Sequence, residues 1–68
     1  MSLSVLSQRE LQVLKLVVEG KTSKEIAADL GVKPSSIYTY RSRIFAKLKI
    51  DNLAKLVCFA VRQGLVTP

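Results

Sequence analysis

The residues best suited to chemistry lie between Leu30 and Ile50, a stretch that has basic side chains and no acidic one. Its five cations, which supply most of the net charge of +6, are Lys33, Arg41, Arg43, Lys47 and Lys49. Serine, threonine and tyrosine hydroxyls stand between them, and such groups hydrogen-bond to phosphate oxygens and to base edges. This combination favours the binding of a polyanion.

Catalytic and metal-binding chemistry is not expected, because the residues that perform it are missing or dispersed. The 68 residues include no His and one Cys, and the five acidic residues are scattered. The sequence therefore offers no general base, no catalytic carboxylate pair and no set of metal ligands. We predict no enzymatic activity, no cofactor and no metal.

Length and composition indicate one small cytoplasmic domain over residues 1–68. An apolar fraction of 49% is enough for one small core. The apolar run at 56–61 is too short for a membrane span, and early charges such as Arg9 and Glu10 interrupt any signal peptide. Cys58 has no internal disulfide partner, which fits a reducing compartment. Residues 1–5 are expected to be a loose terminus or residues added in cloning.

Helical periodicity runs through the whole chain, and no strand pattern competes with it. The sequence predicts an all-α, four-helix domain with helices at about 7–19, 22–30, 34–49 and 51–63. The expected helix ends are the left-handed positions Gly20, Gly31 and Gly64. The expected starts are two capping boxes, Ser7 with Glu10 and Thr22 with Glu25, then Pro34 and the N-cap Asp51.

The second and third helices are separated by residues 31–33 alone. A turn this short makes two helices cross steeply, which is the helix-turn-helix geometry. At about 100° per residue, Ile37, Ile44 and Leu48 share the inner side of the third helix. Its outer side and flanks carry Ser35, Ser36, Tyr38, Thr39, Tyr40, Ser42, Arg43, Ala46 and Lys47.

A basic helix face is often only a solvated face, so the charge alone does not decide the function. Serine and threonine are poorer helix formers than lysine, glutamate or alanine, so a merely solvated helix would not favour them. Their short side chains let a helix approach another surface closely. The tight turn, the hydroxyl-lined face and the confinement of the charge together favour DNA binding.

The fourth helix carries two apolar stripes. Leu56, Phe59 and Ala60 supply a core face, which leaves a second stripe unexplained. Its members are Leu53, Val57 and Val61. They either face the same core or contact a second copy of the domain, and we predict the dimer contact.

Four blocks of residues resemble the LuxR/GerE/NarL-type DNA-binding domain over about residues 5–66. They are Leu6, Ser7, Arg9, Glu10, Val13 and Leu14; Gly20, Lys21, Lys24, Glu25, Ile26 and Ala27; Ser36, Ile37, Tyr40, Arg43, Ile44, Lys47 and Leu48; and Ala60, Val61, Arg62, Gly64 and Leu65. The run Tyr40, Arg41 and Arg43 resembles the branch that includes BvgA, EvgA and UvrY (GacA), which are response regulators with an N-terminal receiver domain.

The resemblance implies a bacterial transcription regulator that binds double-stranded DNA as a homodimer. The third helix would enter the major groove, the fourth would form the dimer interface, and RNA polymerase would be a further candidate partner. Implied base contacts are Tyr38, Thr39 and Ser42. Implied phosphate contacts are Lys24, Ser36, Tyr40, Arg43 and Lys47. Arg41 stands where most members have an aliphatic residue, and we expect it to run its stem along the core edge and reach a phosphate.

Two other functions share parts of these patterns. A sigma-factor region 4 module has a similar helix-turn-helix sequence, although its chain ordinarily ends near the recognition helix. A basic helical module that docks on an acidic protein would have the same charge. A sequence-defined footprint on duplex DNA would exclude the latter.

Overall fold

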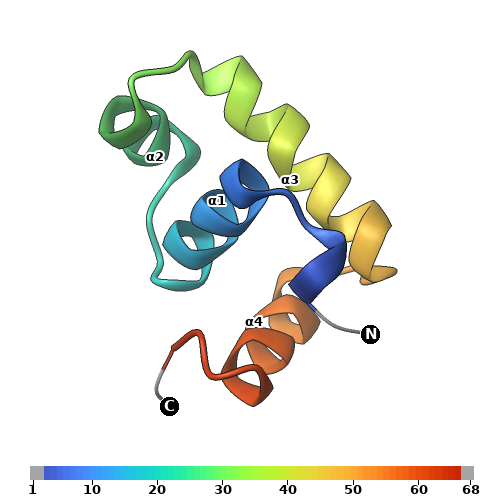
Figure 1. Ribbon diagram of the computed structural model, residues 1–68. Helices are drawn as coiled ribbons and strands as arrows, with labels where there is room; N and C mark the ends of the chain where they lie inside the picture. The colour runs from blue at the N-terminus through green and yellow to red at the C-terminus, as the bar shows by residue number, and fades with distance from the viewer. Residues whose placement is uncertain (1–2, 67–68) are drawn as a thin grey trace.

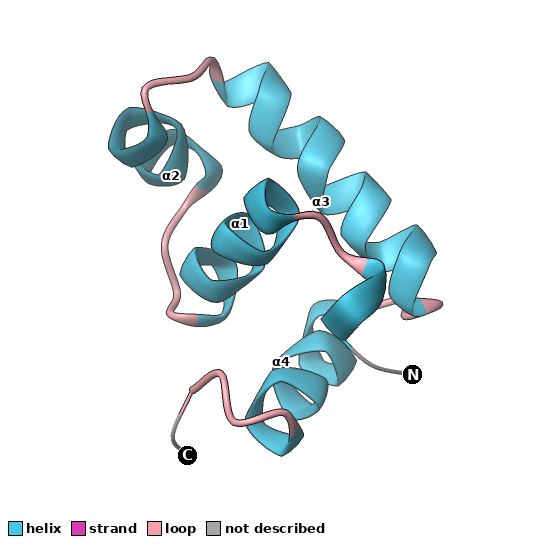
Figure 2. Ribbon diagram, viewed as in Figure 1, coloured by secondary structure: helices cyan, strands magenta, loops and turns pink. Residues whose placement is uncertain are grey.

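The computed structural model describes residues 3–66. A short 3-10 helix, η1 (Leu3–Val5), precedes four α-helices: α1 (Gln8–Val18), α2 (Ser23–Leu30), α3 (Pro34–Leu48) and α4 (Leu53–Arg62). Within these residues all regular structure is helical (Figure 2). The predicted all-α class and its four helices are confirmed, and each predicted helix end lies within two residues of the observed one.

Helix α1 is the centre of the packing, and it contacts α2, α3 and α4 (Figure 1). Every helix buries one apolar stripe against it or its neighbours. The buried apolar side chains are Val13, Leu14, Val17, Ile26, Ala27, Ile37, Ile44, Leu48, Leu56 and Ala60. The inner stripe predicted for α3 is therefore confirmed. In α4, Leu56 and Ala60 are buried and Phe59 is half-buried against the core, as predicted.

Helices α2 and α3 form the predicted helix-turn-helix. In Figure 1, α2 is seen nearly end-on while α3 runs across the view, so the two cross steeply. Gly31 ends α2 with a φ of 67°, a left-handed conformation that glycine adopts without a Cβ clash. Pro34 then occupies the first turn of α3, where no helical partner is needed for its missing N–H.

The two predicted capping boxes are present. Ser7 Oγ accepts from the Glu10 N–H at 3.1 Å, and the Ser7 N–H donates to Glu10 Oε1 at 2.8 Å. Thr22 and Glu25 make the same pair of bonds at the same two distances. These bonds satisfy N–H groups that the first turn of a helix leaves without partners.

The prediction that Asp51 caps α4 is wrong. Asn52 is the N-cap, and its Oδ1 accepts from the Lys55 N–H at 2.9 Å. Asp51 instead pairs with Lys55 Nζ at 3.1 Å. Ile50 packs against the core, so the chain turns through both Asp51 and Asn52 before α4 begins.

All four helices end with the same pair of backbone bonds, and one of these ends was not predicted. At the end of α3, the Lys49 N–H donates to Ala46 O and the Ile50 N–H donates to Phe45 O, at 3.3 and 3.1 Å. Lys49 has a φ of 56°, and it is the one residue other than glycine with a positive φ in the described chain. A side chain in this conformation is strained. At three helix ends the residue with the positive φ is one of the predicted glycines, and at the end of α3 it is Lys49.

Leu3–Val5, which lies in the segment expected to be a loose terminus, forms η1. The Leu6 N–H donates to Leu3 O at 3.0 Å, and Leu3 packs against the core. The partly buried Leu3 side chain removes some apolar surface from water at this end of the chain. Met1 and Ser2 lie outside the described residues.

None of the helices within residues 3–66 is both long enough and apolar enough to cross a membrane. No group of three or more His, Cys, Asp or Glu side chains comes together there in a way that could hold a metal ion.

Candidate nucleic-acid interface

The outer face of α3 presents all three predicted base contacts to solvent. Tyr38, Thr39 and Ser42 are exposed, and Tyr38, at 60%, is the most exposed large apolar side chain described. Thr39 Oγ1 donates to Ser35 O at 3.2 Å, one turn earlier in the helix. The Thr39 hydroxyl proton is therefore engaged, and the side chain offers an acceptor oxygen and a methyl group outward.

Three predicted phosphate contacts line one hollow on α3. Ser36, Tyr40 and Arg43, together with Thr39, surround a shallow space of about 210 Å³. The Tyr40 side chain is half-buried and packs against the core, whereas Arg43 is exposed and has no ion-pair partner among the described residues. Three hydroxyl groups and a guanidinium around one small hollow suit an anionic oxygen.

Lys47, another predicted phosphate contact, is bound to α1. Its Nζ donates to Glu10 Oε1 at 2.7 Å, and this carboxylate is only 2% exposed. The Lys47 side chain remains 41% exposed, so its amino group is still accessible to solvent. The hydrogen bond from Lys47 and the one from the Ser7 N–H lower the pKa of Glu10 below its ordinary value, outweighing the effect of burial.

Arg41 lies on the side of α3 that faces α2. Its Nη1 donates to Ser23 Oγ at 3.1 Å, and Ser23 is only 7% exposed. The guanidinium is thus directed to the start of α2 and not to the outer face of α3. Ser23 could not be predicted from the sequence, because a serine in the first turn of a helix is ordinarily exposed.

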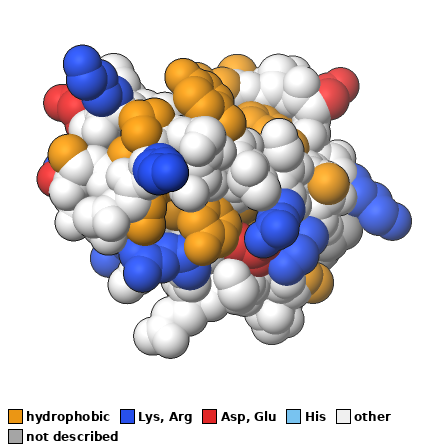
Figure 3. Space-filling model, turned by 90° about the horizontal axis from the view of Figure 1, so that it is seen from above, with side chains coloured by type: hydrophobic (Ala, Val, Ile, Leu, Met, Phe, Trp, Pro, Cys, Tyr) orange, Lys and Arg blue, Asp and Glu red, His pale blue; other side chains and the backbone are white. Residues whose placement is uncertain are grey.

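Lys24 is exposed on α2, next to Ser23 in the chain, and has no ion-pair partner among residues 3–66. Seen from above, the molecule presents basic side chains at several separate places, and acidic side chains lie beside some of them (Figure 3). Because Lys24 and the α3 cations come from two helices, the basic surface extends beyond α3.

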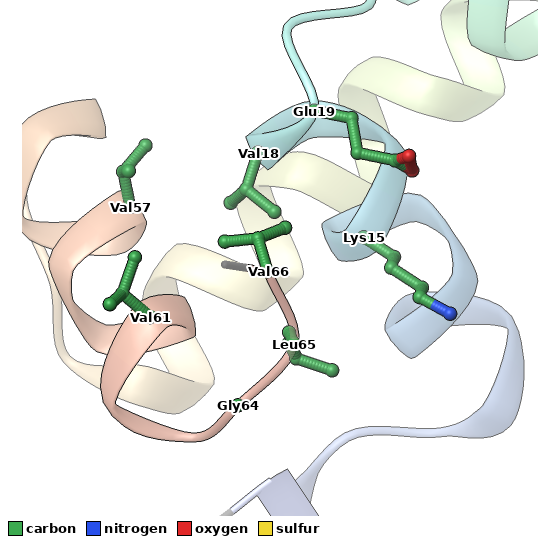
Figure 4. Close-up of a pocket in the computed structure, with 8 residues that line it drawn as sticks. All are labelled: Lys15, Val18, Glu19, Val57, Val61, Gly64, Leu65 and Val66. Carbon is green, nitrogen blue, oxygen red and sulfur yellow. The ribbon is translucent and has the colours of Figure 1, made fainter. Parts of the chain in front are cut away.

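The predicted dimer stripe borders a groove on α4. Leu53 is 46% exposed, and Val57 and Val61 are half-buried. The groove has a volume of about 720 Å³ and is lined by Lys15, Val18, Glu19, Val57, Val61, Gly64, Leu65 and Val66. In Figure 4, Val18 and Val66 lie across from the two α4 valines, while the charged ends of Lys15 and Glu19 point away. The contributions of α1 to this groove were not predicted, because they depend on the packing of α1 on α4.

A sequence model of a protein family described as bacterial regulatory proteins, luxR family, matches residues 4–60. This chain belongs to the luxR family. This finding confirms the resemblance to the LuxR-type domain that the sequence blocks indicated. The chain is a helix-turn-helix domain that binds DNA in a transcriptional regulator. The family is one of regulators and is not typically enzymatic. Neither the sigma-factor module nor the protein-docking module is favoured.

Several curated proteins are similar to this luxR-family domain. The transcriptional regulatory protein FixJ of Azorhizobium caulinodans is 43% identical over 60 residues, which cover 88% of this chain and 28% of FixJ. The response regulator UvrY of Escherichia coli strain K12 is 38% identical with the same coverage, which supports the predicted branch. The probable transcriptional regulator ycf29 of Cyanophora paradoxa is 46% identical over 59 residues, covering 87% of this chain and 28% of its own.

This chain therefore spans less than a third of the length of these curated relatives. Comparison with solved structures gave no match.

Proposed function

We propose that the domain recognises a specific duplex sequence by inserting α3 into the major groove. The observation that carries the proposal is the exposed outer face of α3, where three side chains with hydroxyl groups stand beside the hollow lined by Ser36, Tyr40 and Arg43. Base readout is assigned to Tyr38, Thr39 and Ser42. Phosphate contacts are assigned to Lys24, Ser36, Tyr40, Arg43 and Lys47. Arg41 has a different geometry, because its guanidinium is engaged with α2.

Selection of bound duplexes from a random pool tests this proposal. We expect enrichment of two related half-sites whose centres lie about one helical turn apart. A pool that stays random after selection, with binding that depends on salt alone, would contradict sequence-specific recognition. Repeating the selection with Arg43→Ala provides a control, because loss of a phosphate contact lowers affinity without changing which sequence is enriched.

We further propose that two copies pair on DNA through Leu53, Val57 and Val61. An exposed leucine beside an apolar groove supports this pairing, since a second α4 can fill the groove and cover Leu53. Such an isologous interface matches a two-fold symmetric site on DNA.

Cys58 offers a probe of the pairing, because it is the single cysteine and is exposed on α4. Spin labels attached to Cys58 are expected to report a short distance between the two α4 helices when the selected duplex is added. Val57→Asp places a charge on the stripe and should abolish this distance. An unchanged signal in Val57→Asp, or no coupling on the symmetric duplex, would contradict the α4 interface.

The length of the relatives supports a proposal about the whole protein. We place this domain at the output end of a response regulator whose N-terminal receiver brings two copies together and raises their effective concentration on DNA. The full-length protein should then bind the selected duplex more tightly than residues 1–68 alone. Binding to the chromosome would place the protein in the bacterial cytoplasm, at the nucleoid. RNA polymerase remains a candidate partner of the DNA-bound form.

A further inference from the structure

Arg41 and Ser23 form the one side-chain hydrogen bond that joins α2 to α3 in the described part of the chain. The two residues are 18 positions apart, and the Nη1 to Oγ distance is 3.1 Å. Ser23 is one of two polar residues, with Glu10, that are buried in the described chain. A buried hydroxyl that meets a guanidinium is a directional contact between the two helices.

The position of Arg41 on α3 explains this contact. It lies four residues after Ile37 and three before Ile44, and these two isoleucines are at most 1% exposed. Arg41 therefore leaves α3 close to its inner side, and its own side chain is half-buried. A side chain in this place reaches α2 before it reaches the outer face of α3.

Apolar side chains also join the two helices, because Ile26 and Ala27 of α2 belong to the same core cluster as Ile37 and Ile44 of α3. Apolar burial has no preferred direction, so by itself it permits small rotations and slides of one helix on another. A hydrogen bond has a preferred donor–acceptor distance and direction, so it restricts how one helix can move on the other. In this domain it joins α3 to the residue that directly precedes Lys24.

We propose that Arg41 is a positioning residue for DNA recognition. Its bond to Ser23 holds α2 and α3 at one angle and register, so that Lys24 on α2 and the base-reading side chains of α3 meet one duplex together. This inference rests on the proposed function. This role differs from a phosphate contact, because Arg41 would affect DNA binding through its hydrogen bond to Ser23 and not by touching the DNA.

Ser23→Ala is the decisive variant, since it removes the acceptor and keeps the Arg41 charge. The two probes are the duplex selected by the wild-type domain and a random-sequence duplex. We expect affinity for the selected duplex to fall about tenfold, while affinity for the random duplex and the salt dependence stay unchanged. Arg41→Met should give the same pattern, and the double variant should lose no more than either single variant.

Three results would overturn the inference. Ser23→Ala could bind both duplexes as the wild type does, or the two substitutions could have additive effects. Arg41→Met could weaken binding to both duplexes and reduce the slope of the salt dependence by about one, which is the signature of a phosphate contact.

Thermal unfolding identifies a temperature at which every variant is folded, and binding is measured there. If Ser23→Ala does not fold, Ser23→Cys keeps the size of the side chain and weakens the acceptor. If the wild-type domain selects no duplex at all, the proposed function itself is contradicted. If the wild-type domain selects a duplex but Ser23→Ala binds it equally well, only the role of Arg41 is contradicted.

Discussion

The cations near the DNA-binding face fall into two groups that sequence does not distinguish. Arg41 and Lys47 are bound to side chains of the domain itself, at Ser23 and Glu10. Arg43 and Lys24 have no ion-pair partner among residues 3–66 and extend into solvent. We refer to these as the tethered and the untethered cations. Part of the charge on α3 therefore holds the helix in place, and only part is available in full to a polyanion.

The tethered cations join α3 to two different neighbours. Lys47 connects the C-terminal half of α3 to the start of α1, and Arg41 connects its middle to the start of α2. Both partners are almost completely buried. Buried polar groups are costly without partners, so these contacts specify one arrangement of the three helices.

The largest expected effect is that of Glu10→Ala. This change removes half of a capping box and leaves Lys47 without its carboxylate, and we expect the free energy of unfolding to fall by about 3 kcal/mol. Urea denaturation measures this loss. Glu25→Ala is the matched control, because Glu25 caps α2 in the same way but is exposed and has no lysine in hydrogen-bond contact. If both variants lose the same free energy of unfolding, the contact between Lys47 and Glu10 contributes nothing to stability.

Acid should break the contact between Lys47 and Glu10, because it protonates the Glu10 carboxylate. The pKa of Glu10 in the folded domain lies below the ordinary value of 4.5, chiefly because Lys47 donates to its carboxylate. The resulting stability is fully present above the pKa of the unfolded chain and is lost as pH falls through the lower, folded pKa. Unfolding free energies measured between pH 7 and pH 3 should therefore fall less steeply in Lys47→Met than in the wild type. Parallel curves would contradict the assignment.

On DNA, the untethered Arg43 should affect binding and not stability. Arg43→Ala should weaken binding to all duplexes and reduce the slope of the salt dependence by about 0.9, with unfolding changed by no more than about 0.5 kcal/mol. Lys47→Ala should reduce the slope similarly but also destabilise the fold. Titrations at several salt concentrations, paired with denaturation, separate the two. Arg43→Ala that binds like the wild type at every salt concentration would refute its phosphate contact.

The uncharged outer face should behave differently from both groups of cations. Thr39→Ala should relax the preference at one base pair by about 1 kcal/mol and leave the slope of the salt dependence unchanged. Competition with duplexes that differ at single positions measures this. Thr39→Val retains a methyl group, so preservation of the preference in Thr39→Val would assign the readout to the methyl and not to the acceptor oxygen. A preference unchanged in Thr39→Ala would remove Thr39 from the readout.

The smallest effect concerns Lys49, which matters here for its left-handed backbone conformation at the end of α3 and not for its charge. Lys49→Gly should raise the free energy of unfolding by about 0.5–1 kcal/mol, because glycine relieves the strain of a φ of 56°. Lys49→Ala is the matched control, since it removes the same charge but retains the strain. If Lys49→Ala stabilises the domain as much as Lys49→Gly, relief of charge repulsion and not backbone strain is the cause.

The features predicted correctly from the sequence depend on residues close together in the chain. Capping boxes, glycine-ended helices and apolar stripes involve separations of a few residues, and local geometry determines them. The errors arose where packing overrides a local preference. Asp51 is a good N-cap, yet Asn52 takes that position, because the chain turns through both residues after Ile50 packs on the core.

The sequence by itself thus determined the four helices, the helix-turn-helix and the concentration of charge on α3. Only the tertiary structure decided which cations are tethered, because the Arg41 and Lys47 contacts span 18 and 37 residues. The same holds for the groove beside Val57 and Val61, whose far wall comes from α1 and the residues after α4. Periodicity specifies which side of a helix is apolar, whereas the partner of each polar side chain is set by how the helices pack.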